Sequence, residues 1–582
     1  MSTSPLNHLT PANRDLLTTR QKHLQDRLVT PEKFWPYWKP CNVRVLLVVD
    51  GLDFSDDDFG LSTFIRTLLD MPGGYVRFRI TLAHIGQVGA AAMMAGEPRI
   101  ENRITQFKFD DPAHFTSTKY DQVWLFGIAQ TFAGRGTASN NQPYPTDRLA
   151  DPELRAITEF MNGGGGLFAT GDHGSLGKAL GHAVPRARSM RLWDSTSAQM
   201  ELDEVSMKGQ RRNDTNRLGS SAGSQFEDQS DDTPQIVQPK IYQRTAGIFR
   251  YSFPHPLLCG PKGMIRVMPD HPHEGECIEP APNQTNAQLD FGGPLGPEYP
   301  NATDGGARPL PEVISVSTVL SGTTSGGKDP TLTQCFGGIS AYDGHRASIG
   351  RVVTDATWHH FVNINLVGDS TMPNLDPKSL GFLFSASGQE HLEQIRVYYR
   401  NLAVWLARPN LIVCMNTRIM WQLLWSARTM EAVLATTDLR LADVQPHIFW
   451  IIGKHARDVL GRYASQCQSL KLIIDLMLKP NLPLPLLLQL DPWMPDTPRR
   501  TQLEAVAWFD GEPLVNIALG AALVALREHM PHPDERQVAE LDTDRVAAIL
   551  AEGARVGVER GLASATSAMT ATRTLLRPTQ RP

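Results

Sequence analysis

The alternation of short apolar runs with amphipathic stretches, between residues 43 and 170, constrains the fold more than any other feature. The first apolar run, Val43 to Val49, is interrupted only by Arg44 and stops at Asp50-Gly51. Such a run is typical of a strand buried on both faces, as in a parallel sheet. We expect further elements in the order helix 61–69, strand 76–82, strand 123–126, helix 151–163 and strand 167–170.

Strands that alternate with helices in this way predict an α/β fold, with a doubly wound, mostly parallel sheet and helices on both faces. Large loop insertions interrupt the rhythm over about 195–345, where polar and Pro/Gly-rich stretches dominate. Strands return within 313–354, and an amphipathic helix then runs up to Pro409. Ser387 and Glu390 are expected to form the capping box of that helix.

The chain therefore divides into three parts: an N-terminal arm (1–40), an α/β domain (41–408) and a C-terminal all-α domain (409–582). The last part is rich in Leu and Ala at helical spacing. The sequence of this part shows no cluster of chemically reactive residues. We therefore consider that it binds a protein partner.

Composition excludes several classes of protein. The 582 residues hold 56 Lys and Arg against 61 Asp and Glu, a net charge of −5, which argues against a nucleic-acid partner. The six cysteines lack CxxC spacing, so we expect neither a disulfide framework nor a zinc module. No signal-peptide pattern opens the chain, and the apolar stretch 513–526 is too short to cross a bilayer. We expect a soluble, cytoplasmic protein with no membrane partner.

Acidic and histidine residues follow three of the predicted core strands. The ends of parallel strands meet at one edge of the sheet, where ligands of open α/β sheets bind. The segments are Asp50 to Asp53, Gly171 to Ser175 and Asp355 to His360. The ligand-binding residues that we expect at this edge are Asp50, Asp53, Gly127, Gly171, Gly174 and Ser175.

The second segment is the most informative. A glycine run feeds a short strand, a tight Gly-Asp-His-Gly turn and then a helix expected to start near Ser175. Such a turn exposes its residues to a ligand, and Asp172 or His173 would serve as general acid or base. The alternative is structural: Asp172 caps the helix and His173 is a half-buried histidine.

The third segment adds Asp355, His359 and His360 as candidate catalytic residues. Adjacent histidines on an extended segment point to opposite faces, so only one is expected to face the site. The other histidine is expected to be structural. Asp355 would act in the site or orient a histidine there.

A fourth segment carries residues of the metal-ligand type at close spacing. His271, His273 and Glu274 would be the ligands of a divalent metal, the one cofactor that we consider. The segment matches no familiar zinc signature such as HExxH, and the intervening proline favours an extended polar loop as the alternative.

Four of these stretches together resemble a known family. The stretches RVLLVVDG, YDQVWLFG, GGGLFATGDHG and GRVVTDATWHH resemble the ThuA-like branch of the class I glutamine amidotransferase-like superfamily, over about residues 43–407. The resemblance implies a flavodoxin-like sheet and a role in carbohydrate metabolism, as a hydrolase or as an isomerase or lyase. His173 stands where glutaminases carry their cysteine nucleophile, so amide hydrolysis through a thioester is excluded.

Two hypotheses follow from these patterns. In the first, the chain is an enzyme that acts on a polar small molecule, such as a sugar or glycoside derivative, by His/Asp acid–base chemistry with or without a metal. In the second, it is a non-catalytic binding or scaffold protein whose amidotransferase-like domain is degenerate and whose helical domain binds a partner.

Overall fold

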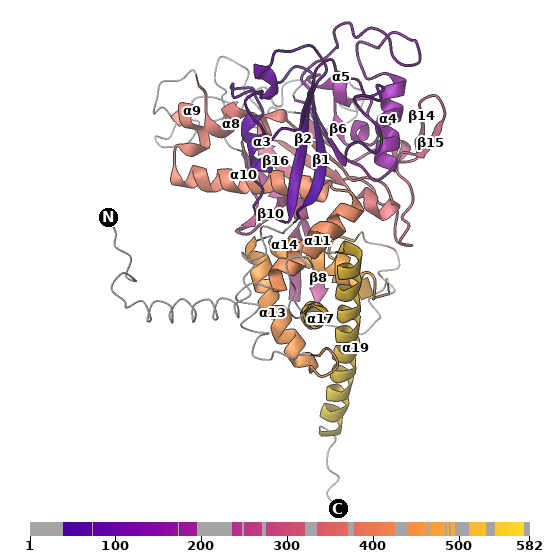
Figure 1. Cartoon of the computed structure of the whole chain (residues 1–582), viewed down its shortest axis with the longest axis vertical. Helices are drawn as coiled ribbons and strands as arrows, with labels where there is room; N and C mark the ends of the chain where they lie inside the picture. Colours follow the sequence, from indigo (N-terminus) through magenta and orange to yellow (C-terminus); the bar gives the residue numbers. More distant parts are fainter. Residues whose placement is uncertain are drawn as a thin grey trace, which may run out of the picture.

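The computed structural model describes residues 39–72, 74–172, 174–194, 235–246, 249–269, 275–319, 334–370, 377–424, 440–463, 465–483, 486–487, 490–494, 511–530 and 542–575. Figure 1 shows an α/β unit, drawn in its upper half, above a helical unit that holds the C-terminal residues. Nearly all of the expected N-terminal arm (1–40) lies outside the described residues, as does much of the insertion. In the described residues, no helix is long and apolar enough to span a bilayer.

In the described residues, a sheet of twelve strands forms the centre of the α/β unit. Its parallel part has the strand order β3-β2-β1-β4-β5-β18. These strands are β1 (Cys41–Val49), β2 (Val76–His84), β3 (Asn102–Ile104), β4 (Gln122–Phe126), β5 (Gly166–Thr170) and β18 (Val352–Asp355). The order reverses between β1 and β4, which is the topological switch point where ligands bind in open α/β sheets.

Apolar side chains alternate between the two faces of these strands, and helices cover both faces. Val45 and Leu47 of β1 pack into the core that includes α3 (Ser62–Leu69) and α10 (Ala386–Trp405). Leu46 and Val48 face the opposite core, with α4 (Asp151–Asn162) and α5 (Lys178–Gly181). The α/β class expected from the sequence is therefore confirmed.

Antiparallel strands widen the sheet beyond β18. They come mostly from the region expected to be loop insertion: β6 (Arg191–Leu192), β7 (Gln235–Pro239), β12 (Val267–Met268), β13 (Glu276–Cys277), β16 (Glu312–Val319) and β17 (Gln334–Tyr342). β17 pairs antiparallel with β18. The insertion thus contributes strands to the main sheet as well as surface loops.

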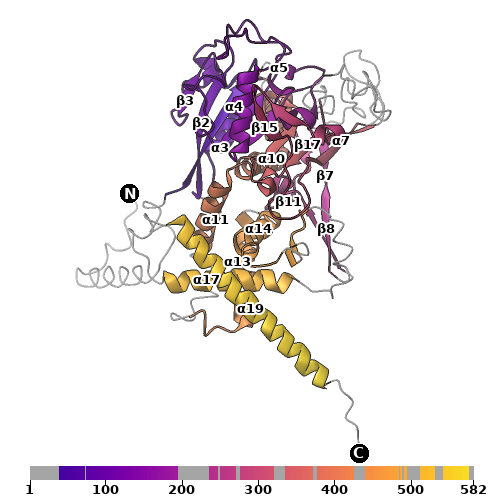
Figure 2. The ribbon, with the colours of Figure 1, turned by 90° about the vertical axis from the view of Figure 1, so that its right-hand side faces the viewer.

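The helical unit has a separate apolar core. Its main helices are α11 (Pro409–Leu424), α13 (Pro446–Tyr463), α14 (Gln466–Ile473), α17 (Glu512–His529) and α19 (Thr543–Leu575). Residues 514–526 of α17 are all buried, as expected for the apolar stretch there, and Figure 2 shows α19 crossing α17. A hairpin from the insertion, β8 (Ile241–Ala246) with β9 (Phe249–Pro254), also reaches this unit, because Trp493 Nε1 donates to Pro254 O (3.0 Å).

A disulfide joins the first strand of the sheet to the first helix of the helical unit. Cys41 in β1 is bonded to Cys414 in α11, across a sequence separation of 373 residues. The sequence predicted no disulfide framework, and it did not reveal this single disulfide, because spacing along the chain does not show a pair that only the tertiary fold brings together.

The Cys41→Ser variant is expected to lose stability. A bond that closes so long a loop restricts the unfolded chain strongly, so unfolding should cost about 2–5 kcal/mol less without it. Urea unfolding of both proteins without reductant measures this difference, and it should nearly vanish when both contain dithiothreitol. The matched control is Cys335→Ser, at a cysteine outside this disulfide. Equal stability of Cys41→Ser and the parent without reductant would contradict the prediction.

Candidate functional site

Parallel pairing places the predicted strand-end residues level with one another. Val49 of β1 pairs with Phe126 of β4, Phe126 with Thr170 of β5, and Thr170 with Asp355 of β18. Asp50, Gly127 and Gly171 are therefore side by side one position later. Because neighbouring strands lie about 4.8 Å apart, the backbones at Asp50 and Gly171 are about 10 Å apart. The structure thus brings the three segments to one edge, as expected.

Close backbone contacts explain the glycines at this edge. The turn after β5 folds back so that Gly177, at a φ of +88°, lies on the ends of β4 and β5. A Cβ added at Gly127 would lie 2.7 Å from Gly177 Cα, and one at Gly171 would lie 2.5 Å from Leu176 O. We expected a helix that begins near Ser175. Instead, the turn is followed by the four-residue helix α5, which begins at Lys178.

Asp172 belongs to a buried polar cluster between β5 and the segment after β18. Thr357 Oγ1 donates to Asp172 Oδ1 (2.9 Å), and His359 Nε2 lies 3.6 Å from Asp172 Oδ2. The other ring nitrogen of His359, Nδ1, is 2.8 Å from Asn365 Oδ1. All four side chains are buried. In a dry environment these contacts fix the orientation of the imidazole beside the carboxylate.

Asp355 and His360 form a second pair, which faces the core. Asp355 Oδ1 lies 2.7 Å from His360 Nδ1, and Tyr398 of α10 donates its hydroxyl to Asp355 Oδ2 (2.8 Å). Asp355 and Tyr398 are fully buried and His360 is 1% exposed. The two adjacent histidines thus contact different carboxylates, and Trp358–His360 is a 3₁₀ turn rather than the extended segment that was expected.

Sequence reasoning missed Arg191, a buried arginine that fixes the ends of β5 and β18. Its guanidinium donates to Asp172 O (2.8 Å), Asp355 O (3.1 Å) and Ala356 O (2.7 Å), and it stacks on Trp193. The signal was available: Arg191 and Trp193 alternate with the apolar residues Met190 and Leu192. An arginine in such a short strand needs buried acceptors.

Asp50 differs from the other carboxylates of the edge. Its Oδ1 accepts hydrogen bonds from the backbone N–H groups of Ile128 (2.7 Å) and Ala129 (3.1 Å), just after β4. Its Oδ2 is buried and has no hydrogen-bond partner in the described part of the chain. Burial disfavours the charged form and outweighs the two N–H donors, so the pKa of Asp50 is raised to about 7.

Two of the remaining predicted ligand residues, Asp53 and Ser175, have local structural partners. Asp53 Oδ1 accepts from Ser55 N (2.8 Å) and Ser55 Oγ (2.7 Å), and so shapes the loop after β1. Ser175 Oγ donates to Asp194 Oδ1 (3.0 Å). Gly174, at a φ of +62°, has open space where a Cβ would be.

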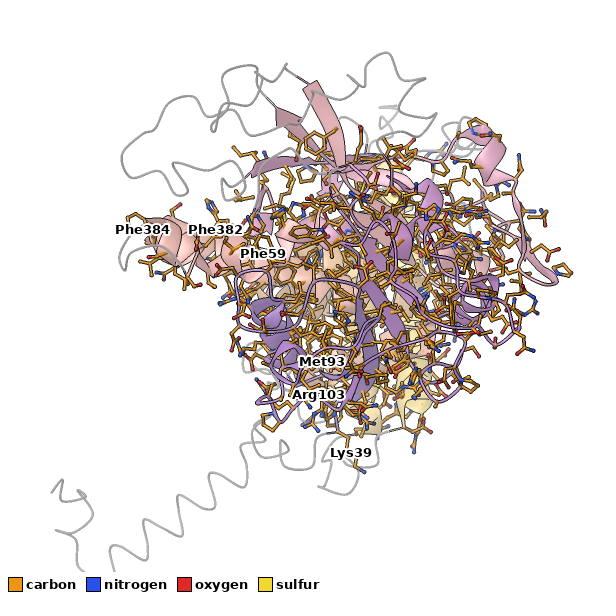
Figure 3. All side chains as sticks on the ribbon, turned by 90° about the horizontal axis from the view of Figure 1, so that it is seen from above. Lys39, Phe59, Met93, Arg103, Phe382 and Phe384 are labelled. Carbon is orange, nitrogen blue, oxygen red and sulfur yellow. A yellow bond between two sulfur atoms is a disulfide. The ribbon has the colours of Figure 1, made fainter. Side chains whose placement is uncertain are left out.

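An exposed aromatic ring lies beside His359. Phe59 is 50% exposed, and its ring lies edge-on to those of Trp358 and His359, with centroids 6.0 and 6.4 Å away. Figure 3, seen from above, shows Phe59 at one side of the ribbon, with Phe382 and Phe384 further out on the same side. An exposed aromatic ring therefore lies against the buried histidine.

Two groups of predicted residues fall outside the described part of the chain. These are His173 in the turn after β5, and His271, His273 and Glu274 of the predicted metal loop. Among the residues that the structure describes, no group of three or more His, Cys, Asp or Glu could hold a metal ion. The roles of His173 and of the metal loop stay predictions.

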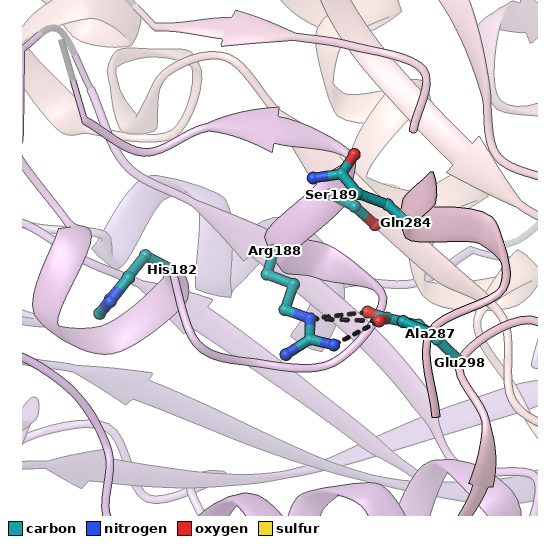
Figure 4. A pocket seen from close by; sticks show the side chains of 6 residues that line it. All are labelled: His182, Arg188, Ser189, Gln284, Ala287 and Glu298. Atoms are coloured by element: carbon teal, nitrogen blue, oxygen red, sulfur yellow. Dashed lines mark hydrogen bonds and ion pairs between the residues drawn. The ribbon is translucent and has the colours of Figure 1, made fainter. Parts of the chain in front are cut away.

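A small cavity is lined by residues that follow α5 and by residues of the insertion, none of which is a predicted site residue. It has a volume of about 270 Å³ and is lined by His182, Arg188, Ser189, Gln284, Ala287 and Glu298. Figure 4 shows that Arg188 turns toward Glu298, with which it pairs. Because Glu298 is 1% exposed and also accepts from Arg186 N (2.6 Å), we interpret this ion pair as structural. We therefore place the candidate functional site at the strand ends and not at this cavity.

Comparisons with known proteins add no assignment. No protein-family model, no curated protein and no solved structure matches the chain.

The raised pKa of Asp50 predicts a pH-dependent loss of stability. Between about pH 4 and pH 7 the unfolded carboxyl ionises while the folded one keeps its proton, so the free energy of unfolding falls as pH rises. In Asp50→Asn nothing titrates there, and the side-chain oxygen can still accept from Ile128 N. Relative to the parent, the variant should gain stability steadily from pH 4.5 to 7.5, as measured by urea unfolding.

Asp56→Asn is the matched control for this measurement. A hydrogen bond from Arg66 lowers the pKa of Asp56, so its contribution changes only at lower pH. The difference between Asp56→Asn and the parent should stay constant from pH 4.5 to 7.5. Parallel curves for Asp50→Asn and the parent would show that Asp50 is ionised throughout this range.

Proposed function

We propose that this chain is an enzyme that acts on a polar small molecule by acid–base chemistry at the carboxyl ends of the parallel strands. The observation that carries the proposal is Asp50, the residue after β1 at the switch point, whose pKa is raised to about 7 and which has one buried oxygen without a partner among the described residues. A carboxyl that titrates near neutral pH can both give and accept a proton under physiological conditions.

The Asp172–His359 pair would supply the second group. Its carboxylate lies one residue beyond the position level with Asp50, two strands along the edge, so about 10 Å separates the backbones. This spacing suits a ligand the size of one sugar ring. The contact of His359 with Asn365 would keep the imidazole oriented toward Asp172 during proton transfer.

The finer assignment is part of the proposal. We infer a flavodoxin-like, class I amidotransferase-like sheet of the ThuA-like type, and a sugar or glycoside derivative as substrate, in a hydrolytic, isomerase or lyase reaction. The strand order that reverses between β1 and β4 and the resemblance of the strand-end stretches support it. Carboxylates near backbone N–H groups are suited to the several hydroxyls of such a substrate.

A binding or scaffold role is the second candidate. The observation that favours it is burial: Asp172 and Asp355 are at most 1% exposed, and each lies against a histidine and accepts a hydroxyl hydrogen bond. Buried, well-paired carboxylates of this kind can be purely structural. The helical unit, with its own core, would then bind a protein partner.

The two candidates differ in what a ligand screen and a set of variants should show. Sugars, glycosides, sugar acids and polyols that bind the native state raise its melting temperature, and turnover of any hit can then be measured. Asp50→Asn and His359→Gln should lower kcat at least about 100-fold, the usual contribution of an acid–base group, with KM much less affected.

Tyr398→Phe is the control, because it removes the hydroxyl that donates to the core-facing Asp355. It should reduce stability by about 1–3 kcal/mol and leave kcat within a few-fold of the parent. Full turnover in both Asp50→Asn and His359→Gln would refute the catalytic proposal. A panel in which nothing shifts the melting temperature would favour the scaffold.

A further inference from the structure

Two more cysteines meet where the α/β unit contacts the helical unit. Cys259 lies in the short strand β10 (Cys259–Gly260), and Cys467 lies in the first turn of α14. The thiol of Cys467 donates a hydrogen bond to that of Cys259, and β10 packs against α14. Both residues are buried, at 5% and 2% exposed. Figure 1 shows β10 directly above α14.

Side chains of α10 and of the first turn of α14 hold this contact in place. Asn401 of α10 donates to Cys259 O (2.9 Å) and accepts from Gln468 of α14. Ser465 caps the first turn of α14 by accepting from Gln468 N (3.2 Å), and its side chain also bonds the Cys259 thiol. Asn401 thus ties the backbone of Cys259 to Gln468, the residue that follows Cys467 in α14.

We propose that Cys259 and Cys467 are a redox-active pair that forms a second disulfide between the α/β unit and the helical unit. The pair lies on the same interface that the Cys41–Cys414 bond already crosses, at a different pair of elements. Its oxidation would make the docking of the helical unit on the sheet depend on the redox state of the surroundings.

The oxidant is a small-molecule or protein disulfide. The Cys259 thiolate attacks one sulfur of that disulfide, which releases one thiol and leaves a mixed disulfide on Cys259. Cys467, after losing its proton to water, attacks Cys259 Sγ and releases the second thiol. Two protein thiols and one disulfide thus become one protein disulfide and two thiols. The hydrogen bond from Cys467 lowers the pKa of Cys259 and so favours its thiolate as the attacking group.

The other cysteines differ from this pair. Burial raises the pKa of Cys277 to about 12, and its sulfur contacts Thr354 rather than a second thiol. Since the Cys259 and Cys467 thiols are themselves buried, exchange requires α14 to move away from β10 for a moment. Oxidation should therefore be slow in the folded protein and faster in mild denaturant.

Peptide mapping of the full-length protein tests the proposal. The protein is incubated with oxidised glutathione, alkylated, digested without reductant and analysed by mass spectrometry. We expect a peptide that contains Cys259 joined to one that contains Cys467, and its disappearance after dithiothreitol. Alkylation of both cysteines, or glutathione retained on Cys259 with no cross-link, would overturn the proposal.

A thermal experiment isolates the second bond from the first. In Cys41→Ser, oxidised glutathione should raise the melting temperature by several degrees, and dithiothreitol should reverse the shift. The shift should be lost in Cys41→Ser/Cys467→Ser and in Cys41→Ser/Cys259→Ala, and should be kept in Cys41→Ser/Cys335→Ser, which retains the pair. A shift that survives in both pair-deleted variants would refute the assignment.

Discussion

The parallel register of β1, β4, β5 and β18 is the constraint on which the candidate site depends. These four strands end close to the same level, and each places its next residues at the same edge. A slip of one residue would exchange the side chains that pack with α3 and α10 for those that pack with α4 and α5, so packing on the two different faces fixes the register. The arrangement of Asp50, Asp172 and Asp355 is therefore a consequence of core packing.

The turn after β5 packs directly on the ends of β4 and β5, and only glycines allow so close a contact between backbones. Gly177 rests on the ends of β4 and β5, and Arg191 then ties the backbone of β5 to that of β18. Desolvating a guanidinium is costly unless it meets good acceptors, so the carbonyls at the strand ends are needed as much as the arginine. This rigid frame leaves Asp50 as the carboxylate of the edge whose second oxygen is buried without a partner in the described part of the protein.

Elements that depend on local sequence patterns were predicted well, whereas features that depend on residues distant in sequence were not predicted. The buried run that became β1, and the alternation that became β2, depend only on neighbours in sequence. The start of α10 was displaced: its cap is Ser385, which accepts from Gly388 N, and not the expected pair of Ser387 and Glu390. Two overlapping serine patterns cannot be distinguished until the preceding loop fixes where the helix begins.

The convergence of Asp172 with His359 was predictable because topology alone brings strand ends together, whereas the state of each carboxylate was not. Asp355 and Asp50 both end buried strands, yet Asp355 receives the Tyr398 hydroxyl from α10, while Asp50 receives two backbone N–H groups on one oxygen only. Burial raises the pKa of Asp50 because these two donors only partly offset it. A sequence shows which residue ends a strand; the pKa depends on what the rest of the fold places opposite each oxygen. Chemistry at this edge is therefore better supported at the under-satisfied carboxyl than at the fully paired ones.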